Sequence, residues 1–407
     1  MFHKKTVRDV PLAGKTVLVR TDYNVPLLPG GGIGDDFRIK RSLDTLRYLM
    51  KNGCRVIICS HLGRPDGRVV AKYSLAPVAE RLAQLLEAPV AFVQESVGDQ
   101  VTQAVKRLSA GQLLMLENLR FHAGEEANDA SFAKLLAESC GAEYFVQDGF
   151  GVSHRRHAST DAITGCLPSV AGLLLEKEYQ TITGALSHPG RPLVAVLGGA
   201  KISDKISVIE RFVKLADQII VGGAMANTFL KFKGMPIGKS VHEDGLDDVI
   251  KRIYQRADDK LRGHRSADDF ILLPSDAAVA PAIDAEQRRQ TVSVSDVRLN
   301  EYILDIGPAS IAEAVNRVKD AQTVVWSGTL GYAELPQFAF GSARLALQLA
   351  SQKRTLSIIG GGDTADFAVN WDAKRGESFS HVSTGGSASL ELMAGMSLPG
   401  IDCLLDD

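Results

Sequence analysis

Short, nearly continuous apolar runs, separated by segments with helical spacing, constrain the fold of this chain more than any other feature of its sequence. In the first half of the chain these runs are Thr16–Arg20, Arg55–Ser60, Gln112–Glu117 and Glu143–Gln147. In the second half they are Leu193–Leu197, Gln218–Val221, Phe270–Leu273, Thr323–Trp326, Thr355–Ile359 and Phe379–Ser383. Strands buried on both faces of a parallel sheet have this pattern, and helices connect them. We therefore predict an α/β protein built on doubly wound parallel sheets.

The segments between the runs carry signals for the ends of helices. Ser74 precedes one apolar helical face, and either Asn128 or Asp129 precedes the next. Gly141 follows that second face and can end its helix. These signals support helices between successive strands.

The stretch Pro168–Pro189 is predicted to be a helix that joins two domains. Ser169 can cap its start, and a His-Pro-Gly sequence supplies its end. A chain of 407 residues exceeds the length at which a single hydrophobic core stops growing, so two domains are expected. We assign residues 1–168 to the first domain, 169–188 to the joining helix and 189–388 to the second domain. An ordinary crossover helix inside one domain is the alternative.

The composition argues against several classes of function. The net charge of −2 disfavours generic binding to nucleic acid or to a membrane surface. The N-terminal residues lack the apolar segment of a signal peptide, and no apolar run is long enough to cross a membrane. The 5 cysteines show no metal-binding spacing, so we expect reduced thiols in a cytoplasmic protein.

Polar and basic residues follow the predicted strands of the first half. Ligands of doubly wound sheets bind beyond the carboxyl ends of the strands, so these residues are candidates for a binding site. They are Asp22, Tyr23, Asn24, His61, Leu62, Gly63, Arg64, Arg120, His154, Arg155 and His157, with Arg38 from a neighbouring loop. Crowded cations repel one another unless an anion accompanies them, and arginine grips phosphate and carboxylate oxygens in pairs. We predict a small, multiply anionic substrate, with Asp22 and Asn24 hydrogen-bonded to its hydroxyl groups.

Glycines follow most of the predicted strands of the second half. They are Gly198-Gly199, Gly222-Gly223, Gly328, Gly360-Gly361-Gly362 and Gly385-Gly386. Glycine lets the backbone approach a ligand closely, and a helix that follows offers free N–H groups to an anion. Tight turns would explain a single pair in any α/β fold, but the repetition favours a nucleotide-binding platform.

Two lysines and one aspartate make this prediction more specific. If a helix has begun by Lys201, then Lys201 and Lys205 lie one turn apart on one face. Like charges so placed cost about 0.2–0.5 kcal/mol, which a bound polyphosphate would reverse. Asp363 lies at a glycine-rich helix start and is the candidate ligand for Mg²⁺, which prefers a carboxylate together with substrate phosphates.

Two familiar nucleotide-binding motifs do not account for these glycines. The chain contains no GxxxxGK[ST] sequence, which excludes a P-loop protein. Gly360-x-Gly362-x-x-Ala365 satisfies a loose dinucleotide pattern, but no acidic residue follows convincingly at the expected distance after another strand. A dinucleotide-dependent dehydrogenase is therefore the weakest of the hypotheses.

A series of longer motifs runs in order through nearly the whole chain. They are Val19–Pro26, Ser60–Pro65, Glu117–Phe121, His154–Thr160, Leu167–Lys177, Leu197–Ile206, Leu304–Pro308 and Ser380–Leu390. In these motifs the chain resembles the phosphoglycerate kinase family. The resemblance implies a bilobal, hinge-bending monomer of two Rossmann-like domains, with a C-terminal tail, residues 389–407, that packs back on the first domain. It implies reversible phosphoryl transfer from 1,3-bisphosphoglycerate to ADP in glycolysis and gluconeogenesis, with Mg²⁺ bound as MgADP or MgATP.

The resemblance also assigns roles to individual residues. Those implied for phosphoglycerate are Asp22, Tyr23, Asn24, Arg38, His61, Leu62, Gly63, Arg64, Arg120 and Arg155. Those implied for the nucleotide are Lys201, Lys205, Glu334 at the ribose, Gly361, Gly362, Asp363 through the metal, and Thr364. The attacking carboxylate is already ionised at neutral pH, so catalysis needs positioning and charge neutralisation rather than a general base. The catalytic candidates are Arg38, Lys205, Gly361 and Gly385.

One loop of the second half departs from the family pattern. Where the family reads Trp-Asn-Gly-Pro, this chain has Trp326-Ser327-Gly328-Thr329. Ala333 replaces the aromatic residue that precedes the ribose-binding glutamate. Serine is shorter than asparagine, and threonine lacks the fixed backbone angle of proline. A catalytically weakened or non-catalytic relative that binds phosphoglycerate is therefore the second hypothesis.

Overall fold

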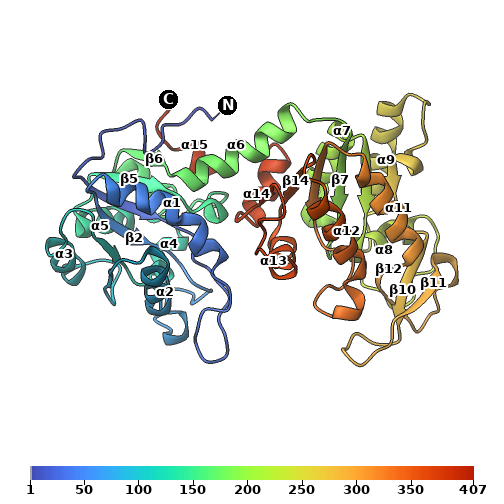
Figure 1. Ribbon diagram of the computed structural model, residues 1–407, viewed down its shortest axis with the longest axis horizontal. Coiled ribbons are helices and arrows are strands. Elements are labelled where there is room, and N and C mark those ends of the chain that lie inside the picture. The colour runs from blue at the N-terminus through green and yellow to red at the C-terminus, as the bar shows by residue number, and fades with distance from the viewer. Residues whose placement is uncertain (1) are drawn as a thin grey trace. The chain divides into compact units, whose positions relative to one another are not determined.

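The computed structural model describes residues 2–407, which form two compact units. Unit 1 comprises the residues up to Gln180 together with Ser397–Asp407, and unit 2 comprises Thr181–Met396. The boundary falls within helix α6 (Leu173–Ser187). Both ends of the chain belong to unit 1 (Figure 1).

Unit 1 is built on a parallel sheet of six strands in the order β3-β4-β2-β1-β5-β6. Its strands are β1 (Thr16–Arg20), β2 (Arg55–Cys59), β3 (Val90–Phe92), β4 (Leu113–Met115), β5 (Tyr144–Gln147) and β6 (Ser169–Ala171). Its further helices are α1 (Phe37–Lys51), α2 (Ala76–Leu86), α3 (Asp99–Lys106), α4 (Ala123–Glu126), α5 (Ala130–Cys140) and α15 (Pro399–Asp402). The sequence predicted four of these strands but not the short β3 and β6.

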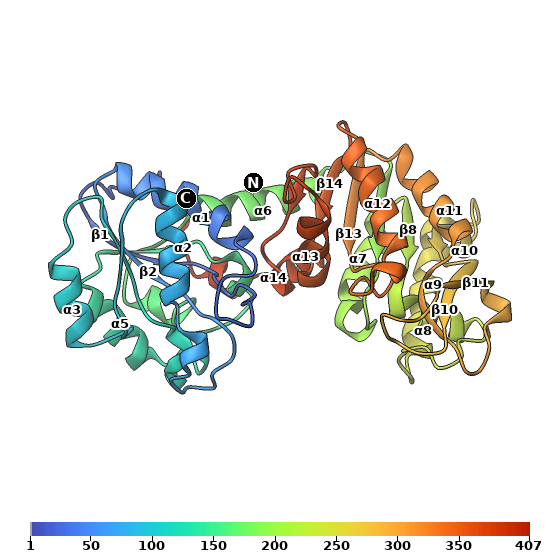
Figure 2. The same ribbon diagram turned by 60° about the horizontal axis from the view of Figure 1, so that its bottom comes forward.

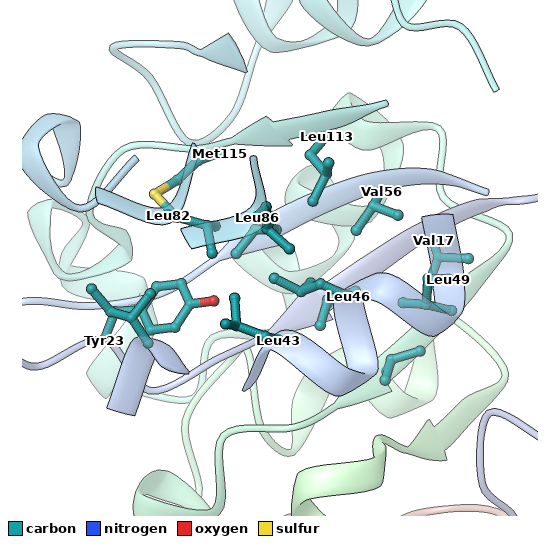
Figure 3. Close-up of a cluster of buried hydrophobic side chains, with 14 of the residues drawn as sticks. Val17, Tyr23, Leu43, Leu46, Leu49, Val56, Leu82, Leu86, Leu113 and Met115 are labelled. Carbon is teal, nitrogen blue, oxygen red and sulfur yellow. The ribbon is translucent and has the colours of Figure 1, made fainter. Parts of the chain in front are cut away.

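Helices cover both faces of this sheet, which explains why its strands are apolar throughout. Successive residues of a strand point to opposite faces. Val17 of β1 packs with leucines of α1 and α2 in the cluster of Figure 3, whereas Leu18 packs with α3 and α5 on the other face. A strand without a solvated face has no polar alternation.

The ends of α5 follow the predicted signals, whereas the N-cap of α2 is Leu75 rather than Ser74. The side chain of Asp129 accepts hydrogen bonds from the backbone N–H groups of Ser131 and Phe132, so Asp129 rather than Asn128 caps α5. Gly141 ends α5 in the left-handed conformation, with φ of 52°. Glycine takes this conformation without the steric cost that a Cβ atom brings.

The joining helix starts later than the sequence indicated. Ser169 does not cap a helix, because Ser169–Ala171 pairs with β5 as strand β6. Helix α6 begins at Leu173, whose N–H group donates to Thr45 Oγ1 over 3.0 Å. Asp148 Oδ1 accepts from the N–H group of Leu174 over 3.0 Å. These acceptors come from elsewhere in unit 1, which local helix-start signals cannot reveal.

The last residues of the chain pair with the first ones. The N–H group of Lys5 donates to Leu405 O over 2.8 Å, and that of Leu405 donates to Ser169 O over 3.0 Å. This returning segment begins at Ser397, whereas residues 389–396 group with unit 2.

Unit 2 combines a parallel sheet of six strands with a small antiparallel sheet. The large sheet has the order β15-β14-β13-β7-β8-β9 and comprises β7 (Leu193–Leu197), β8 (Gln218–Val221), β9 (Ile271–Leu272), β13 (Thr323–Ser327), β14 (Leu356–Ile359) and β15 (His381–Val382). Its helices are α7 (Ile206–Leu215), α8 (Gly223–Phe232), α9 (Asp247–Leu261), α10 (Ala267–Phe270), α11 (Pro308–Lys319), α12 (Phe340–Ser351), α13 (Gly362–Trp371) and α14 (Ser387–Met393).

The small sheet was not foreseen from the sequence. It pairs β10 (Asp276–Ala280) with β11 (Gln290–Ser293) and β12 (Tyr302–Ile306). Helices α8 and α11 pack against it (Figure 2). Strand β11 lies within the charged segment 286–300, for which the sequence predicted no strand. Most of β11 is exposed and polar, so it lacks the apolar signature of a buried strand.

A cavity in the core of unit 1 is expected to destabilise the protein. Leu46 is 0% exposed within the cluster of Figure 3, so Leu46→Ala is expected to lower the free energy of unfolding by about 2–5 kcal/mol. Urea denaturation followed by circular dichroism measures this change. Leu135→Ala on α5, where the side chain is 45% exposed, is the control and should cost far less. Equal losses in the two variants would contradict the packing described.

Candidate functional site

Basic side chains gather in unit 1 beyond the carboxyl ends of its strands. We call this group the cationic cluster; its members are Arg20, Arg38, His61, Arg120, His154, Arg155 and His157. All but Arg20 were predicted at a common edge of the sheet. Unit 1 holds these cations through hydrogen bonds and ion pairs with its own backbone and acidic side chains.

Two of the predicted polar residues hold Arg38. The guanidinium of Arg38 donates to Asp22 Oδ2 over 3.2 Å and to the backbone oxygen of Asn24 over 3.1 Å. The side-chain oxygen of Asn24 in turn accepts from the N–H group of Gly63 over 2.9 Å. The side chain of Arg38 keeps 25% of its surface exposed, so it is oriented but still accessible to a ligand.

Arg120 is more deeply buried than Arg38. It lies on a single 3-10 turn, Leu119–Phe121, which the side chain of Asn118 caps. The guanidinium donates to Gly63 O over 2.9 Å and lies 3.1 Å from Glu126 Oε1. Burial lowers the pKa of Arg120 below its ordinary value.

Arg20 is a member of the cluster that sequence reasoning missed. Its side chain is 0% exposed and lies 3.7 Å from Glu125, which is also 0% exposed. Ser159 Oγ accepts from Arg20 Nε over 2.7 Å and donates to Glu125 Oε1 over 2.6 Å. The available signal was an arginine at the end of an otherwise apolar strand, Thr16–Arg20, where a buried charge requires a partner.

The three histidines of the cluster are held in the neutral form. Burial, followed by the positive charge of nearby arginines, lowers the pKa of His61 well below its ordinary value. The same causes lower the pKa of His154 to about 4 and that of His157 to about 3. At neutral pH the positive charge of the cluster is therefore carried by its arginines.

Not every predicted substrate residue presents its side chain to this site. Tyr23 is 0% exposed, packs in the core cluster of Figure 3, and its hydroxyl group pairs with Ser42 Oγ over 2.7 Å. Leu62 is also in that core, at 2% exposure. Alternation along the chain turns these two side chains inward. Arg64 is exposed and Arg155 is half-buried.

In unit 2, Lys205 is anchored by backbone oxygens rather than by a helix face. Its Nζ atom donates to Gly198 O over 2.8 Å and to Ser327 O over 2.9 Å. Burial lowers the pKa of Lys205 to about 8, although Asp363 and Asp204 act in the opposite direction. This ammonium group connects the loops after β7 and β13.

The expectation that Lys201 and Lys205 share a helix face was wrong. Helix α7 begins only at Ile206, after a 3-10 turn over Ser203–Lys205, and Lys201 is exposed ahead of both. Glu243 holds this turn by accepting from the N–H group of Ser203 over 3.1 Å. A contact between residues so far apart in the sequence is invisible to local helix signals.

The glycines of unit 2 allow two loops to touch through their backbones. A Cβ atom on Gly328, whose φ is 105°, would lie 2.0 Å from Gly198 O. The N–H groups of Gly361 and Gly385 donate to Ser389 Oγ and Ser383 Oγ, over 3.1 and 3.0 Å. These two N–H groups, which were expected to face an anion, thus already have protein acceptors.

The loops after β7 and β13, helix α8 and strand β12 enclose a pocket of about 150 Å³ in unit 2. Its walls are mainly backbone and apolar side chains, and among the predicted nucleotide residues Glu334 and Asp363 line it. Thr364 is buried, and its hydroxyl group accepts from the N–H group of Gly328 over 2.6 Å. Gly362 begins α13, and open space surrounds the position of its missing Cβ atom.

Asp363 is the predicted residue that suits a magnesium ion. It is exposed, lies in the first turn of α13 and acts electrostatically on Lys205. Residues 2–407 contain no cluster of three or more histidine, cysteine or acidic side chains that would hold a metal ion by themselves. A single carboxylate fits Mg²⁺, because this ion is commonly held by one or two carboxylates plus substrate phosphates.

Comparisons with known proteins agree on one family. A model of the family described as phosphoglycerate kinase matches residues 7–396. The chain is similar to a phosphoglycerate kinase of Pelotomaculum thermopropionicum, with 44% identity covering 99% of both chains. It is 46% identical to one of Chloroflexus aurantiacus over 100% of both chains.

Solved structures give the same result. The structure of phosphoglycerate kinase from Coxiella burnetii has a TM-score of 0.81 and 35% identity, covering 99% of each chain. That from Pyrococcus horikoshii has a TM-score of 0.83 and 29% identity, covering 99% of this chain and 98% of the other. Within residues 2–407, no helix has the length and apolar character needed to cross a membrane.

The neutral histidines predict that acid destabilises the protein. In the unfolded chain a histidine has a pKa near 6.5, so below that pH the unfolded state binds protons that the folded state does not. We expect the free energy of unfolding to fall as the pH drops from about 6.5 towards 4, by about 1.4 kcal/mol per pH unit for each histidine. Asp148 opposes this with one proton, because burial raises its pKa to about 7.

Urea denaturation at several pH values measures this dependence. His157→Gln should flatten the slope by about one proton, since the removed group titrates only in the unfolded state. His188→Gln, at an exposed position, is the control. A slope that His157→Gln leaves unchanged would contradict a neutral, buried His157.

Proposed function

The chain belongs to the phosphoglycerate kinase family, and from this premise we propose how its residues carry out the reaction. The enzyme is a phosphotransferase of glycolysis and gluconeogenesis that reversibly transfers a phosphoryl group from 1,3-bisphosphoglycerate to ADP, giving 3-phosphoglycerate and ATP. The two units offer different groups to a ligand, and this difference best supports the proposal that unit 1 binds phosphoglycerate and unit 2 binds the nucleotide. Unit 1 offers clustered arginines. Unit 2 offers a pocket lined by glycines, Glu334 and two aspartates, Asp305 and Asp363, and Lys205 lies beside Gly199 of its lining.

Unit 1 is proposed to bind phosphoglycerate through the cationic cluster. Arginine forks form paired hydrogen bonds with phosphate and carboxylate oxygens, which suits a ligand that carries both groups. Asp22 and Asn24 have two tasks, since they orient Arg38 and can also bond the hydroxyl group of the substrate. The remaining residues proposed for this site are His61, Gly63, Arg64, Arg120 and Arg155.

Unit 2 is proposed to bind the nucleotide in its pocket. Glu334 lines the pocket and is suited to accept hydrogen bonds from ribose hydroxyl groups. Lys201, Lys205 and the start of α13 from Gly361 to Thr364 would meet the phosphates. Asp363 would hold Mg²⁺, which supplies charge neutralisation for the phosphates when it is bound.

The chemistry requires no general base. The attacking carboxylate of 3-phosphoglycerate is ionised at neutral pH, and the histidines of the cluster have depressed pKa values, so they carry no proton available for donation as imidazolium. Charge spreads over the equatorial oxygens of the transferred group, and fixed cations stabilise it. Arg38 and Lys205 are the proposed catalytic cations. Gly361 and Gly385 are proposed to allow close backbone approach there.

The rival functions have less support. The relatives compared carry the name of the kinase and match the chain over its full length, which favours an active enzyme over a non-catalytic descendant. The same family membership removes the dehydrogenase hypothesis. We further propose a cytoplasmic monomer in which α6 acts as a hinge. The five free cysteines are compatible with a reducing compartment.

Arg38 gives a direct test of the proposed site. Arg38→Ala is expected to lower kcat/KM about 10²- to 10³-fold, because it removes a preoriented cation from the transferred phosphoryl group. A coupled assay of ADP-dependent consumption of 1,3-bisphosphoglycerate measures this loss. Arg47→Ala on the same helix is the control, since Arg47 is exposed and its guanidinium donates to the backbone oxygen of Leu85. Equal rates in Arg38→Ala and wild type would refute this role.

Asp363 tests the proposed metal site separately from catalysis. Isothermal calorimetry with ADP should show a gain in affinity on adding Mg²⁺, and Asp363→Asn should abolish most of that gain. Asp366→Asn, one turn further along α13, is the matched control. A magnesium-dependent gain that survives in Asp363→Asn would place the metal elsewhere, whatever the rate of phosphoryl transfer.

A further inference from the structure

Arg20 makes a contact inside the cationic cluster whose consequences extend to the ligand. Its Nη2 atom lies 3.2 Å from Nδ1 of His61. The guanidinium is fixed in place, because Nε donates to Ser159 Oγ over 2.7 Å and Nη1 donates to Thr21 O over 2.5 Å. All three nitrogens of this buried guanidinium are therefore engaged by unit 1 itself.

The chemistry of the two side chains determines the direction of this hydrogen bond. A guanidinium only donates hydrogen bonds and does not lose its proton in a protein. His61 Nδ1 must therefore be the acceptor, which excludes both a proton on Nδ1 and the imidazolium form. A neutral imidazole with an unprotonated Nδ1 carries its proton on Nε2.

We propose that Arg20 is a positioning residue that holds His61 as the neutral Nε2–H tautomer, so that His61 presents a hydrogen-bond donor to an anionic oxygen of phosphoglycerate. This proposal rests on the function proposed above for the ligand of unit 1. Within residues 2–407, Nε2 has no hydrogen-bond partner, and His61 retains 3% of its surface exposed. The donor is thus kept for a ligand.

The groups around His61 also favour its neutral form. Burial, Arg20, Arg120, Arg38 and His157 all lower its pKa, in that order. Asp22 is the acidic group opposite, with Oδ1 3.9 Å from Nδ1. That separation is too long for a hydrogen bond, whereas Arg20 is within reach. Asp22 instead accepts from Arg38.

The benefit of such a device is a donor whose state does not change with pH. A free histidine titrates near pH 6.5, and it would alternate between one and two N–H groups as the cell's pH varies. Fixed by Arg20, His61 offers one N–H group of constant direction. The Arg20–Glu125 pair fixes the protonation state of His61 and places no further titrating group next to the ligand.

Nitrogen NMR on the ligand-free, full-length protein tests the tautomer without relying on activity. The two ring nitrogens of His61 are expected to give the signals of a protonated Nε2 and an unprotonated Nδ1 from about pH 5 to 8. A protonated Nδ1, or a titration centred near pH 6.5, would overturn the proposal. His61→Gln identifies the signals by their disappearance.

Two substitutions of His61 separate the ring nitrogens in a binding measurement. Glutamine places an amide N–H near the position of Nε2, whereas asparagine reaches only the position of Nδ1. By calorimetry, His61→Asn should weaken 3-phosphoglycerate binding about 10- to 100-fold, and His61→Gln should recover most of this loss. Equal losses in the two variants, or a smaller loss for His61→Asn, would contradict a donor at Nε2.

The role of Arg20 itself requires a variant that leaves no buried charge unpaired. Arg20→Gln combined with Glu125→Gln removes both members of the pair, and the pKa of His61 is expected to rise towards 6.5 in the NMR titration. An unchanged tautomer and pKa would refute positioning by Arg20. If the wild-type signals are as expected but the protein transfers no phosphoryl group, the proposed function fails while the tautomer assignment stands.

Discussion

The proposed binding site of unit 1 depends on one buried ion pair, Arg20 with Glu125. Both side chains are 0% exposed, and they lie 3.7 Å apart with Ser159 bonded to each of them. Removing one member of such a pair typically costs about 3–5 kcal/mol, because the other charge is left buried and unpaired. Glu125 is the counter-charge beneath a group of arginines that would otherwise repel one another. Glu125 balances the charge of the buried Arg20, so the more exposed Arg38 can remain available to an anionic ligand.

Unit 2 holds its buried cation, Lys205, through backbone carbonyl groups rather than through an acidic side chain. The loops after β7 and β13 approach so closely that a Cβ atom on Gly198 would lie 2.2 Å from Thr329 O. This contact brings Gly198 O and Ser327 O together, and both accept from Lys205. The ammonium group of Lys205 is thereby held beside Gly199, which lines the pocket. The close approach of the two loops at glycine thus fixes the position of the Lys205 ammonium group.

The parts of the structure that were predictable are those governed by local pattern. Apolar runs predicted all six strands of the large sheet of unit 2 and four of the six in unit 1, because a strand covered on two faces cannot tolerate polar residues. The cap at Asp129 and the stop at Gly141 are equally local. The sequence could not reveal contacts made over long separations: Ser169 lies in a strand because it pairs with β5, and Lys205 is held in part by the carbonyl group of the distant Ser327. Strand β11 was missed because its side chains are mostly exposed. The burial of the Tyr23 side chain was not foreseen, because residues that flank a site alternate between ligand and core.

The departures from the family pattern at Ser327 and Thr329 concern side chains, whereas the hydrogen bonds of these two residues are made by their backbone atoms. Ser327 O accepts from Lys205 and from the N–H group of Gly198, over 2.9 Å in each case. Thr329 O accepts from the N–H group of Gly199 over 3.1 Å. An asparagine and a proline at positions 327 and 329 would offer the same two carbonyl oxygens. The replacement leaves Ser327 Oγ buried without a hydrogen-bond partner, a local cost of about 1–3 kcal/mol. That cost bears on the stability of the loop, while the atoms that hold Lys205 are retained, which favours an active enzyme.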